Sequence, residues 1–271
     1  MGYNKYMRIE RLNLKKLPNT RDLGGLPAAE GKKIRRGKLI RSGKLYKLPE
    51  STVARLKAAG LTAVIDMRTD KEREEKPCTQ IKGVKYYRLP LVCTATTGIT
   101  HQRSMAGTMR RESKRIKSEF GTADKYMESM YKILLFDEGS AARLKTFFDI
   151  LLNEDGCVLW HCNAGKDRTG IAAMLVEAVL GVDEEIIIQD YVASNKFRRR
   201  KRFIQKAGLS IIPVMPKFKQ ILRALMDAKP QYIITAVKDI KERYGSIIGY
   251  CKEFIGLTDE DILTLKNKYL E

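Results

Sequence analysis

The chain has 271 residues, of which 44% are hydrophobic and 31% are charged, and this composition excludes an intrinsically disordered or fibrous protein. Its length predicts one globular domain spanning residues 1–271. Because 52 Lys and Arg residues outnumber 32 Asp and Glu residues, the net charge of +20 favours anionic partners: phosphorylated substrates, an anionic membrane surface or nucleic acid.

In the first half of the chain, short apolar stretches predict strands, and a longer stretch that ends at a glycine predicts a helix. In chain order these are a strand at 39–41, a helix at 51–59, and strands at 62–67 and 84–89. Residues 93–135 are polar and weakly periodic up to about residue 122 and regularly helical from 123. We interpret 93–135 as an inserted lid with a helical end.

The second half of the chain is predicted to be mainly helical. A helix at 141–152 precedes a short apolar strand at 157–160, and a helix at 171–180 is apolar on nearly all sides, which is typical of a central buried helix. Further helices are expected at 184–193, 217–226, 233–244 and 259–269. Strands that alternate with helices predict an α/β fold with a central, mostly parallel sheet flanked by helices.

The strand at 157–160 leads into the run His161-Cys162-Asn163-Ala164-Gly165-Lys166-Asp167-Arg168-Thr169-Gly170. The backbone N–H groups of residues 163–168 can converge on one point, where the N-terminus of the following helix adds positive potential. This arrangement makes a cradle for an oxyanion. The same field lowers the pKa of the Cys162 thiol, so that its thiolate can attack phosphorus.

Each side chain of this loop has an expected role. The planar fork of Arg168 fits two equatorial oxygens of a phosphoryl group, and Ala164 and Gly165 keep bulk away from it. The Thr169 hydroxyl can donate a hydrogen bond to the sulfur, and His161 can orient the loop backbone. The predicted phosphate-binding residues are Asn163, Ala164, Gly165, Lys166, Asp167 and Arg168.

A carboxylic acid must protonate the leaving oxygen. Asp167 lies within the loop beside Arg168, and we predict that it is the general acid. Asp66 is the rival, because it ends the strand at 62–67 and should lie at the carboxyl edge of the sheet, where ligands gather in α/β folds.

The cysteines and histidines argue against a metal centre. The five cysteines are odd in number and form no C-x-x-C pair, which favours free thiols over disulfides or a zinc cluster. With only His101 and His161, the chain has no pair of histidines at metal-binding spacing, and the expected chemistry needs no metal or other cofactor. No apolar run is long enough for a membrane span or a signal peptide, so we expect a cytoplasmic protein; secretion without a cleaved signal is compatible with the same sequence.

The loop resembles that of the bacterial and fungal tyrosine phosphatase family, His-Cys-x-x-Gly-Lys-Asp-Arg-Thr-Gly. The resemblance covers nearly the whole chain and is weakest at 93–125. It extends to segments 19–25, 36–42, 64–68 with Glu72-Arg73, 244–246 and 257–262. It implies a protein tyrosine phosphatase-like fold with C-terminal helices at 244–271, and substrates that are phosphotyrosine, phosphoinositides or both.

Carried onto this loop, the resemblance implies that Cys162 is the nucleophile, Arg168 the phosphate binder and Asp167 the acid. It also implies that Lys166 is an extra cation for a multiply phosphorylated substrate. From the residues alone, Lys166 could equally face solvent.

Two other functions are compatible with parts of the sequence. An RNA 5′-triphosphatase uses the same Cys-x5-Arg chemistry and would benefit from a basic surface, but the Lys166-Asp167 pair and the N-terminal segments argue against it, so nucleic acid is not the expected partner. A catalytically weak module could bind phosphate through the basic runs at 103–117 and 196–206. The intact Cys162, Asp167 and Arg168 argue against such a module, since a binder needs no nucleophile.

Overall fold

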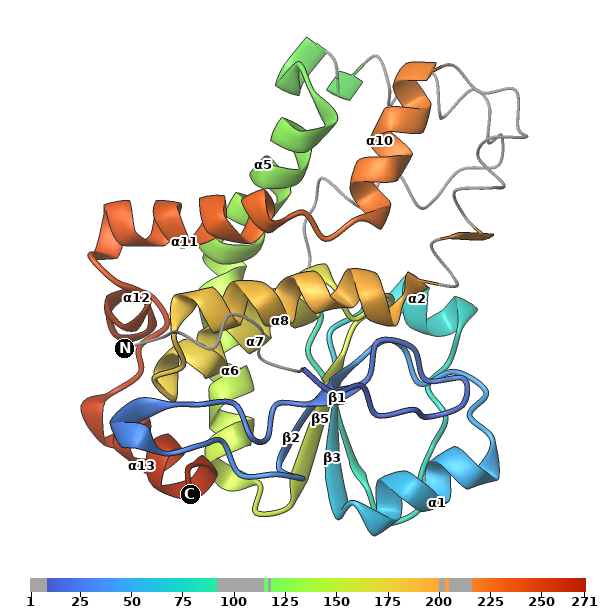
Figure 1. The fold of residues 1–271 in the computed structure, drawn as a ribbon, viewed down its shortest axis with the longest axis vertical. Helices are drawn as coiled ribbons and strands as arrows, with labels where there is room; N and C mark the ends of the chain where they lie inside the picture. The colour runs from blue at the N-terminus through green and yellow to red at the C-terminus, as the bar shows by residue number, and fades with distance from the viewer. Residues whose placement is uncertain (1–8, 92–114, 117, 200–202, 205–215) are drawn as a thin grey trace.

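The structure of the protein is a computed structural model, which describes residues 9–91, 115–116, 118–199, 203–204 and 216–271 (Figure 1). Its centre is a five-stranded sheet in the order β1-β2-β5-β3-β4. The strands are β1 (Arg21–Asp22), β2 (Leu39–Ser42), β3 (Leu61–Asp66), β4 (Lys85–Arg88) and β5 (Cys157–His161). β1 is antiparallel to β2, and all the other pairs are parallel. The predicted α/β fold with a mostly parallel sheet is therefore confirmed.

The central strand β5 determines where chemistry can take place. All five of its residues are buried, as expected for a strand with parallel neighbours on both sides and covered faces. His161, its last residue, lies opposite Ser42 of β2 and Asp66 of β3. The carboxyl ends of the three middle strands thus meet in one row, and the loop that follows His161 starts from that row.

Two apolar clusters cover the two faces of the sheet, because side chains alternate along each strand. One face, which includes Val64 and Leu159, packs against α1 (Glu50–Ala58). The opposite face, which includes Ile65 and Trp160, packs against α7 (Asp167–Val179). Every α7 residue from 169 to 176 is buried, which confirms the prediction of a central buried helix.

Several further helices pack on this second side of the sheet, through α7 (Figure 1). α8 (Glu184–Phe197) packs on α7, and α11 (Pro230–Tyr244) packs on α8 and on α5 (Ala123–Phe136). α10 (Pro216–Met226) also lies against α5. The others are the short 3-10 turn η1 (Ala29–Gly31), α2 (Asp70–Glu75), α6 (Glu138–Asn153), α12 (Ile247–Glu253) and α13 (Asp259–Tyr269).

The predicted strands and helices correspond to observed elements, but four short elements had no counterpart among the predicted ranges. These are β1, η1, α2 and α12. α7 also begins at Asp167 rather than at residue 171, so that the last residues of the predicted phosphate loop form the first helical turn. No helix among the described residues is long and apolar enough to cross a lipid bilayer.

Most of the predicted lid at 93–135 lies outside the described residues, as does most of the basic run at 103–117. The described end of the lid segment is α5, which is amphipathic and packs its buried face on the second side of the fold. α5 matters for the site because one of its buried tyrosines, Tyr131, reaches the phosphate loop.

Candidate active site

The phosphate loop joins the end of β5 to the start of α7, and Cys162 is its first residue. The cysteine is only 3% exposed, and the backbone N–H of Gly165 donates a hydrogen bond to its sulfur at 3.2 Å. The loop turns at Gly165 with a φ of +67°, and a Cβ atom there would lie 2.4 Å from the carbonyl oxygen of Ser42. Only glycine fits this position, because both the backbone conformation and the space exclude a side chain.

The surroundings of Cys162 favour its thiolate. Burial by itself raises the pKa of the thiol, but the charge of Arg168 and the hydroxyl and backbone N–H of Thr169 lower it, and the net pKa lies below the ordinary value. The Thr169 hydroxyl is buried and makes no hydrogen bond of good geometry among the described residues, yet it lies near enough to the sulfur to stabilise negative charge. The loop therefore holds an activated sulfur at the bottom of a cradle of N–H groups.

Arg168 is held by a carboxylate that sequence analysis did not assign to the site. Its Nη1 and Nη2 donate to the two oxygens of Glu72 at 2.7 and 2.8 Å, and Nη1 also donates to the Met67 carbonyl at 3.2 Å. These contacts use three of the five N–H donors of the guanidinium. The two that remain, on Nε and Nη2, lie on one edge of the fork and match two oxygens of a phosphoryl group.

Glu72 is positioned by the first turn of α2. It forms a capping box with Thr69, in which the Thr69 hydroxyl accepts from the Glu72 N–H and the Glu72 carboxylate accepts from the Thr69 N–H. Burial would raise the pKa of Glu72, but Arg168 lowers it to about 2. The T-x-x-E spacing is a sequence signal for a capping box, but it gives no sign of the contact with Arg168.

Asp167 points toward a tyrosine from α5. Its Oδ1 accepts a hydrogen bond from the Tyr131 hydroxyl at 2.6 Å, and that hydroxyl also lies 2.6 Å from the hydroxyl of Tyr191 in α8. Burial, followed by the charge of Asp167, raises the pKa of Tyr131 well above its usual value, so the phenol keeps its proton and can donate. The Asp167 side chain is 24% exposed and is thus the more accessible of the two candidate acids.

Lys166 is fully inside the protein, which contradicts the interpretation that it faces solvent. Its ammonium donates to the carbonyls of Leu225 and Asp227, at 2.8 and 2.9 Å, where α10 ends. It also lies 3.3 Å from Asp167 Oδ1. Burial lowers its pKa. A lysine at the C-terminus of a helix satisfies carbonyls that have no partner within the helix, so in this conformation Lys166 connects the loop to α10.

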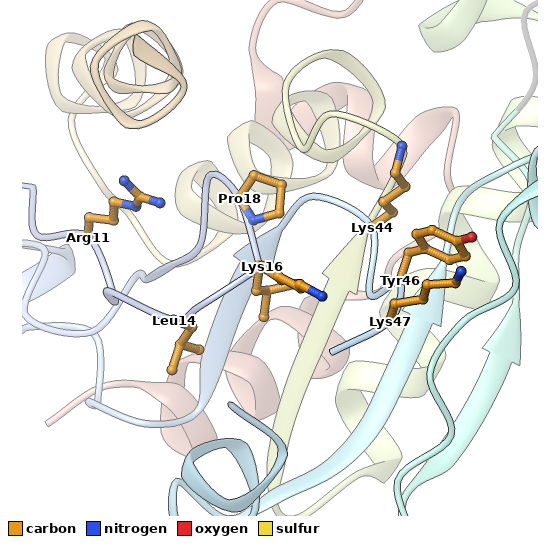
Figure 2. Close-up of a pocket in the computed structure, with 8 residues that line it drawn as sticks. Arg11, Leu14, Lys16, Pro18, Lys44, Tyr46 and Lys47 are labelled. Carbon is orange, nitrogen blue, oxygen red and sulfur yellow. The ribbon is translucent and has the colours of Figure 1, made fainter. Parts of the chain in front are cut away.

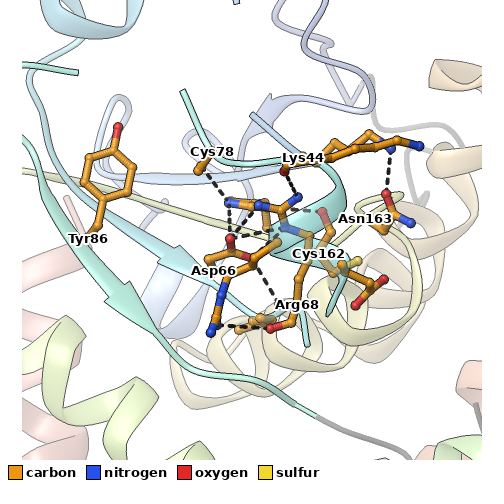
Figure 3. A network of polar contacts seen from close by, with 12 residues as sticks. Lys44, Asp66, Arg68, Cys78, Tyr86, Cys162 and Asn163 are labelled. Atoms are coloured by element: carbon orange, nitrogen blue, oxygen red, sulfur yellow. Dashed lines mark hydrogen bonds and ion pairs between the residues drawn. The ribbon is translucent and has the colours of Figure 1, made fainter. Parts of the chain in front are cut away.

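Asp66 ends β3 opposite His161 and lies outside the loop, where Arg68 binds it (Figure 3). Both of its oxygens bind Arg68, with Nε and Nη2 of Arg68 donating at 2.9 and 2.7 Å. Although burial would raise the pKa of Asp66, the hydrogen bonds from Arg68 lower it below its ordinary value. A buried carboxylate that is paired in this way keeps its charge and is poorly placed to give up a proton.

His161 lies beside Asp66 and contacts both the first residue of the loop and Cys78. Its Nδ1 lies 3.1 Å from the Cys162 carbonyl, which requires the proton on Nδ1 and leaves Nε2 to accept from the thiol of Cys78 at 3.6 Å. Burial lowers the His161 pKa to about 4 and raises the Cys78 pKa to about 12, so both groups are neutral. Asp66, Cys78 and His161 each have an atom that could bind a metal ion, and these three atoms lie within 4.8 Å of one another. However, the Asp66 oxygen is bound by Arg68, and the Cys78 sulfur and His161 Nε2 are in contact with each other. This arrangement does not fit a metal centre.

The outer side of the loop is clamped by Asn19. Its amide nitrogen donates to the carbonyls of Gly165 and Ala164 at 2.6 and 3.3 Å. In a trans peptide the C=O and the next N–H point in opposite directions. By holding these two carbonyls outward, Asn19 turns the N–H groups of Gly165 and Lys166 inward, and the Gly165 N–H does reach the Cys162 sulfur.

A buried ionic cluster supports this clamp. Arg41 donates to the same Gly165 carbonyl at 3.3 Å and forms an ion pair with Asp190 of α8. Arg21 donates to the Asn19 side-chain oxygen at 2.7 Å and also pairs with Asp190. Asn163, the residue after the cysteine, is held at the mouth of the loop because its Oδ1 accepts from Lys44 Nζ at 2.7 Å. The predicted loop residues are thus brought together, whereas the residues that hold them come from distant segments.

Comparisons with known proteins give a consistent picture. A family model described as the tyrosine phosphatase family matches residues 12–271. A protein of Cupriavidus necator whose name places it among tyrosine-protein phosphatases is 28% identical over 261 residues, covering 94% of this chain and 86% of the relative. The triple specificity protein phosphatase PtpB of Mycobacterium tuberculosis is 27% identical over 254 residues, covering 87% of this chain and 90% of the relative.

Among solved structures, Pseudomonas aeruginosa TpbA matches 72% of this chain and 89% of its own, at 19% identity and a TM-score of 0.33. A score this low carries no conclusion about the fold, which therefore rests on the sheet and helices described above.

Proposed function

Since this chain belongs to the tyrosine phosphatase family, we propose that it hydrolyses phosphomonoesters on phosphotyrosine and phosphoinositides through a phosphocysteine at Cys162. The observation that carries the proposal is the buried Cys162, whose pKa is lowered by Arg168 and by the start of α7. A merely structural buried cysteine has the opposite tendency, as Cys251 illustrates: burial raises its pKa to about 12.

In the first step, the Cys162 thiolate forms the S–P bond while the bond from phosphorus to the ester oxygen breaks. The inward N–H groups of the loop and the open edge of Arg168 bind the three non-bridging oxygens as their charge grows in the transition state. Asp167 gives its proton to the leaving oxygen, so that an alcohol or phenol departs rather than an alkoxide.

In the second step, a water attacks the phosphocysteine, the S–P bond breaks and inorganic phosphate is released. Asp167, now ionised, accepts a proton from that water and returns to its starting state. The sulfur leaves as a thiolate, and the lowered pKa of Cys162 makes it a better leaving group.

Asp167 is the acid in this proposal, and Asp66 has a supporting role. Asp167 is partly exposed and oriented by Tyr131, whereas Asp66 is bound on both oxygens by Arg68. We further propose that the segment 93–135 acts as a lid, since Tyr131 at its helical end connects it directly to the acid. Movement of α5 would then change the orientation of Asp167.

The experiment compares phosphate release by the wild type and by Cys162→Ser, without added metal. The substrates are a phosphotyrosine peptide, a phosphoserine peptide, phosphoinositides and an RNA with a 5′-triphosphate. The phosphoserine peptide is included because the M. tuberculosis relative is named for triple specificity. A matched control is Cys251→Ser, which replaces a buried cysteine in α12, outside the loop.

We expect release from phosphotyrosine and phosphoinositides that vanishes in Cys162→Ser and persists in Cys251→Ser. Turnover that survives in Cys162→Ser would overturn the phosphocysteine mechanism. Release from the RNA alone would favour the triphosphatase, and tight binding of phosphate without any release would favour a binding module.

A further inference from the structure

A basic cavity lies beside the phosphate loop and is not used by the chemistry described above (Figure 2). It has a volume of about 430 Å³ and is formed by two segments of the N-terminal region, 11–18 and 44–47. Four of its eight lining residues are cations: Arg11, Lys16, Lys44 and Lys47. None of the eight is acidic. We call this cavity the basic groove.

The floor of the basic groove is apolar. Leu14 and Leu17 are 5% and 1% exposed and belong to the apolar cluster on the α1 side of the sheet. Pro18 and the half-buried Tyr46 ring complete the lining. The groove thus combines a buried apolar floor with cations that are mostly exposed, a combination that suits a ligand with both apolar and anionic groups.

The basic groove is joined to the catalytic loop by direct hydrogen bonds. Lys44 Nζ donates to Asn163 Oδ1 at 2.7 Å, and Asn163 follows Cys162 in the loop. The backbone N–H of Gly43, the residue before Lys44, donates to the Pro18 carbonyl at 2.8 Å, which ties together the two segments that form the groove. A substrate held at Cys162 therefore has the groove immediately next to it, on the Asn163 side.

Two of the groove lysines adopt an unfavourable backbone conformation. Lys16 and Lys47 have φ angles of +59° and +48°, in the left-handed region that favours glycine. Neither residue is a glycine, and neither side chain is buried. Strain of this kind persists only where the surrounding structure enforces it, and it often occurs at ligand-binding sites.

We propose that the basic groove binds acidic residues that flank the phosphotyrosine of a peptide substrate. The inference rests on the proposed function, because it needs a phosphoryl group bound at Cys162. The four cations favour carboxylates, and the apolar floor favours a neighbouring hydrophobic side chain of the same peptide. An inositol polyphosphate would satisfy the cations but has no apolar part for Leu14, Leu17 and the Tyr46 ring.

The test uses two phosphotyrosine peptides that differ only in the replacement of flanking Glu by Gln. The measured quantity is the ratio of kcat/KM for the acidic peptide to kcat/KM for the neutral peptide. It is compared in the wild type, in the groove variant Lys16→Ala/Lys47→Ala and in the control Lys57→Ala/Lys82→Ala, whose lysines are also exposed but lie outside the groove.

We expect the wild type and the control to prefer the acidic peptide by about tenfold at low salt, and the groove variant to lose most of this preference. The wild-type preference should shrink as salt rises from about 0.05 to about 0.5 M, since exposed charges are screened. Equal ratios in the groove variant and the wild type, or no preference in the wild type, would overturn the proposal.

Two further arms separate other outcomes. If the groove variant loses activity toward a water-soluble phosphoinositide and keeps its preference for the acidic peptide, the occupant is a second phosphate and the peptide proposal is wrong. If the wild type hydrolyses neither peptide, the proposed function fails. Calorimetric binding of both peptides to Cys162→Ser then decides whether the groove still selects the acidic one, and equal affinities would reject it.

Discussion

Replacing Glu72 with Gln tests how Arg168, the proposed phosphate-binding residue, is held in place. The change removes the charge that binds both terminal nitrogens of Arg168. It keeps an oxygen that can still accept from the Thr69 N–H, so the cap of α2 can persist. Arg168 is 18% exposed and Glu72 is 12% exposed, so neither charge is well solvated without the other.

The contribution of the ion pair between Glu72 and Arg168 to folding stability follows from the pKa of Glu72. A pKa of about 2 instead of 4.5 corresponds to about 3 kcal/mol of folding stability near neutral pH. Because the pKa is depressed in the folded protein, this contribution is complete above pH 4.5 and is lost as the pH falls through about 2. The Gln variant has no such contribution at any pH.

Activity and stability give two separate measurements. We expect kcat/KM for a small aryl phosphate to fall by about 10-fold to 100-fold in Glu72→Gln, because the fork of Arg168 loses its orientation. In urea unfolding, the difference in stability between wild type and variant should narrow by about half between pH 7 and about pH 3. Glu74→Gln, an exposed position on the same helix, is the matched control.

A wild-type kcat/KM in Glu72→Gln would mean that Arg168 is oriented by something other than Glu72. A stability difference between wild type and variant that stays constant with pH is the second contradicting outcome. That result would mean that Glu72 titrates near its ordinary pKa and that the ion pair with Arg168 contributes little in solution.

Three other substitutions test the rest of the loop. Gly165→Ala should abolish turnover and lower the midpoint of thermal unfolding, since its Cβ would lie 2.4 Å from the Ser42 carbonyl oxygen. An active, equally stable variant would mean that the loop does not pass this close to Ser42. Tyr131→Phe should lower kcat about tenfold for alkyl phosphates. The loss should be smaller for nitrophenyl phosphate, whose leaving oxygen hardly needs protonation by an acid. Equal losses for the two substrates would argue against a role of Tyr131 in orienting Asp167. Asn19→Ala should raise KM for phosphotyrosine about tenfold, because the Gly165 carbonyl loses its 2.6 Å donor, and an unchanged KM would contradict the clamp.

Sequence patterns predicted the parts of the fold that are locally determined. The inner strands are apolar runs bounded by turn residues, and the helix after the loop is apolar on all sides, so both could be recognised without tertiary information. β1 has only two residues, both charged, and all six residues of α2 are charged. Neither element therefore has an apolar pattern that could be recognised in the sequence. β1 is formed by pairing with β2, and α2 is stabilised by its capping box.

The same division holds for the candidate site. Residues from His161 to Thr169 are contiguous, and their order predicts their roles. Glu72, Tyr131 and Asn19 act on that loop from 96, 36 and 146 positions away, through contacts that depend on how the helices pack. Asn19 and Glu72 did stand in segments that resemble the family, so a signal was present, but it marked the positions without giving their contacts.

The buried cluster behind the loop adds charge as well as rigidity. Burial and the negative charge of Asp190 raise the pKa of Glu177 well above its usual value, whereas Arg21 and Arg41 keep the pKa of Asp190 low despite its burial. The guanidinium groups of Arg21 and Arg41 both pair with the Asp190 carboxylate. Arg41 also places its positive charge beside the Gly165 carbonyl. Positive charge at this oxygen polarises the peptide and strengthens its N–H as a donor on the opposite side, toward the inside of the loop. The sheet and α8 thus contribute to the electrostatics of the loop from behind it.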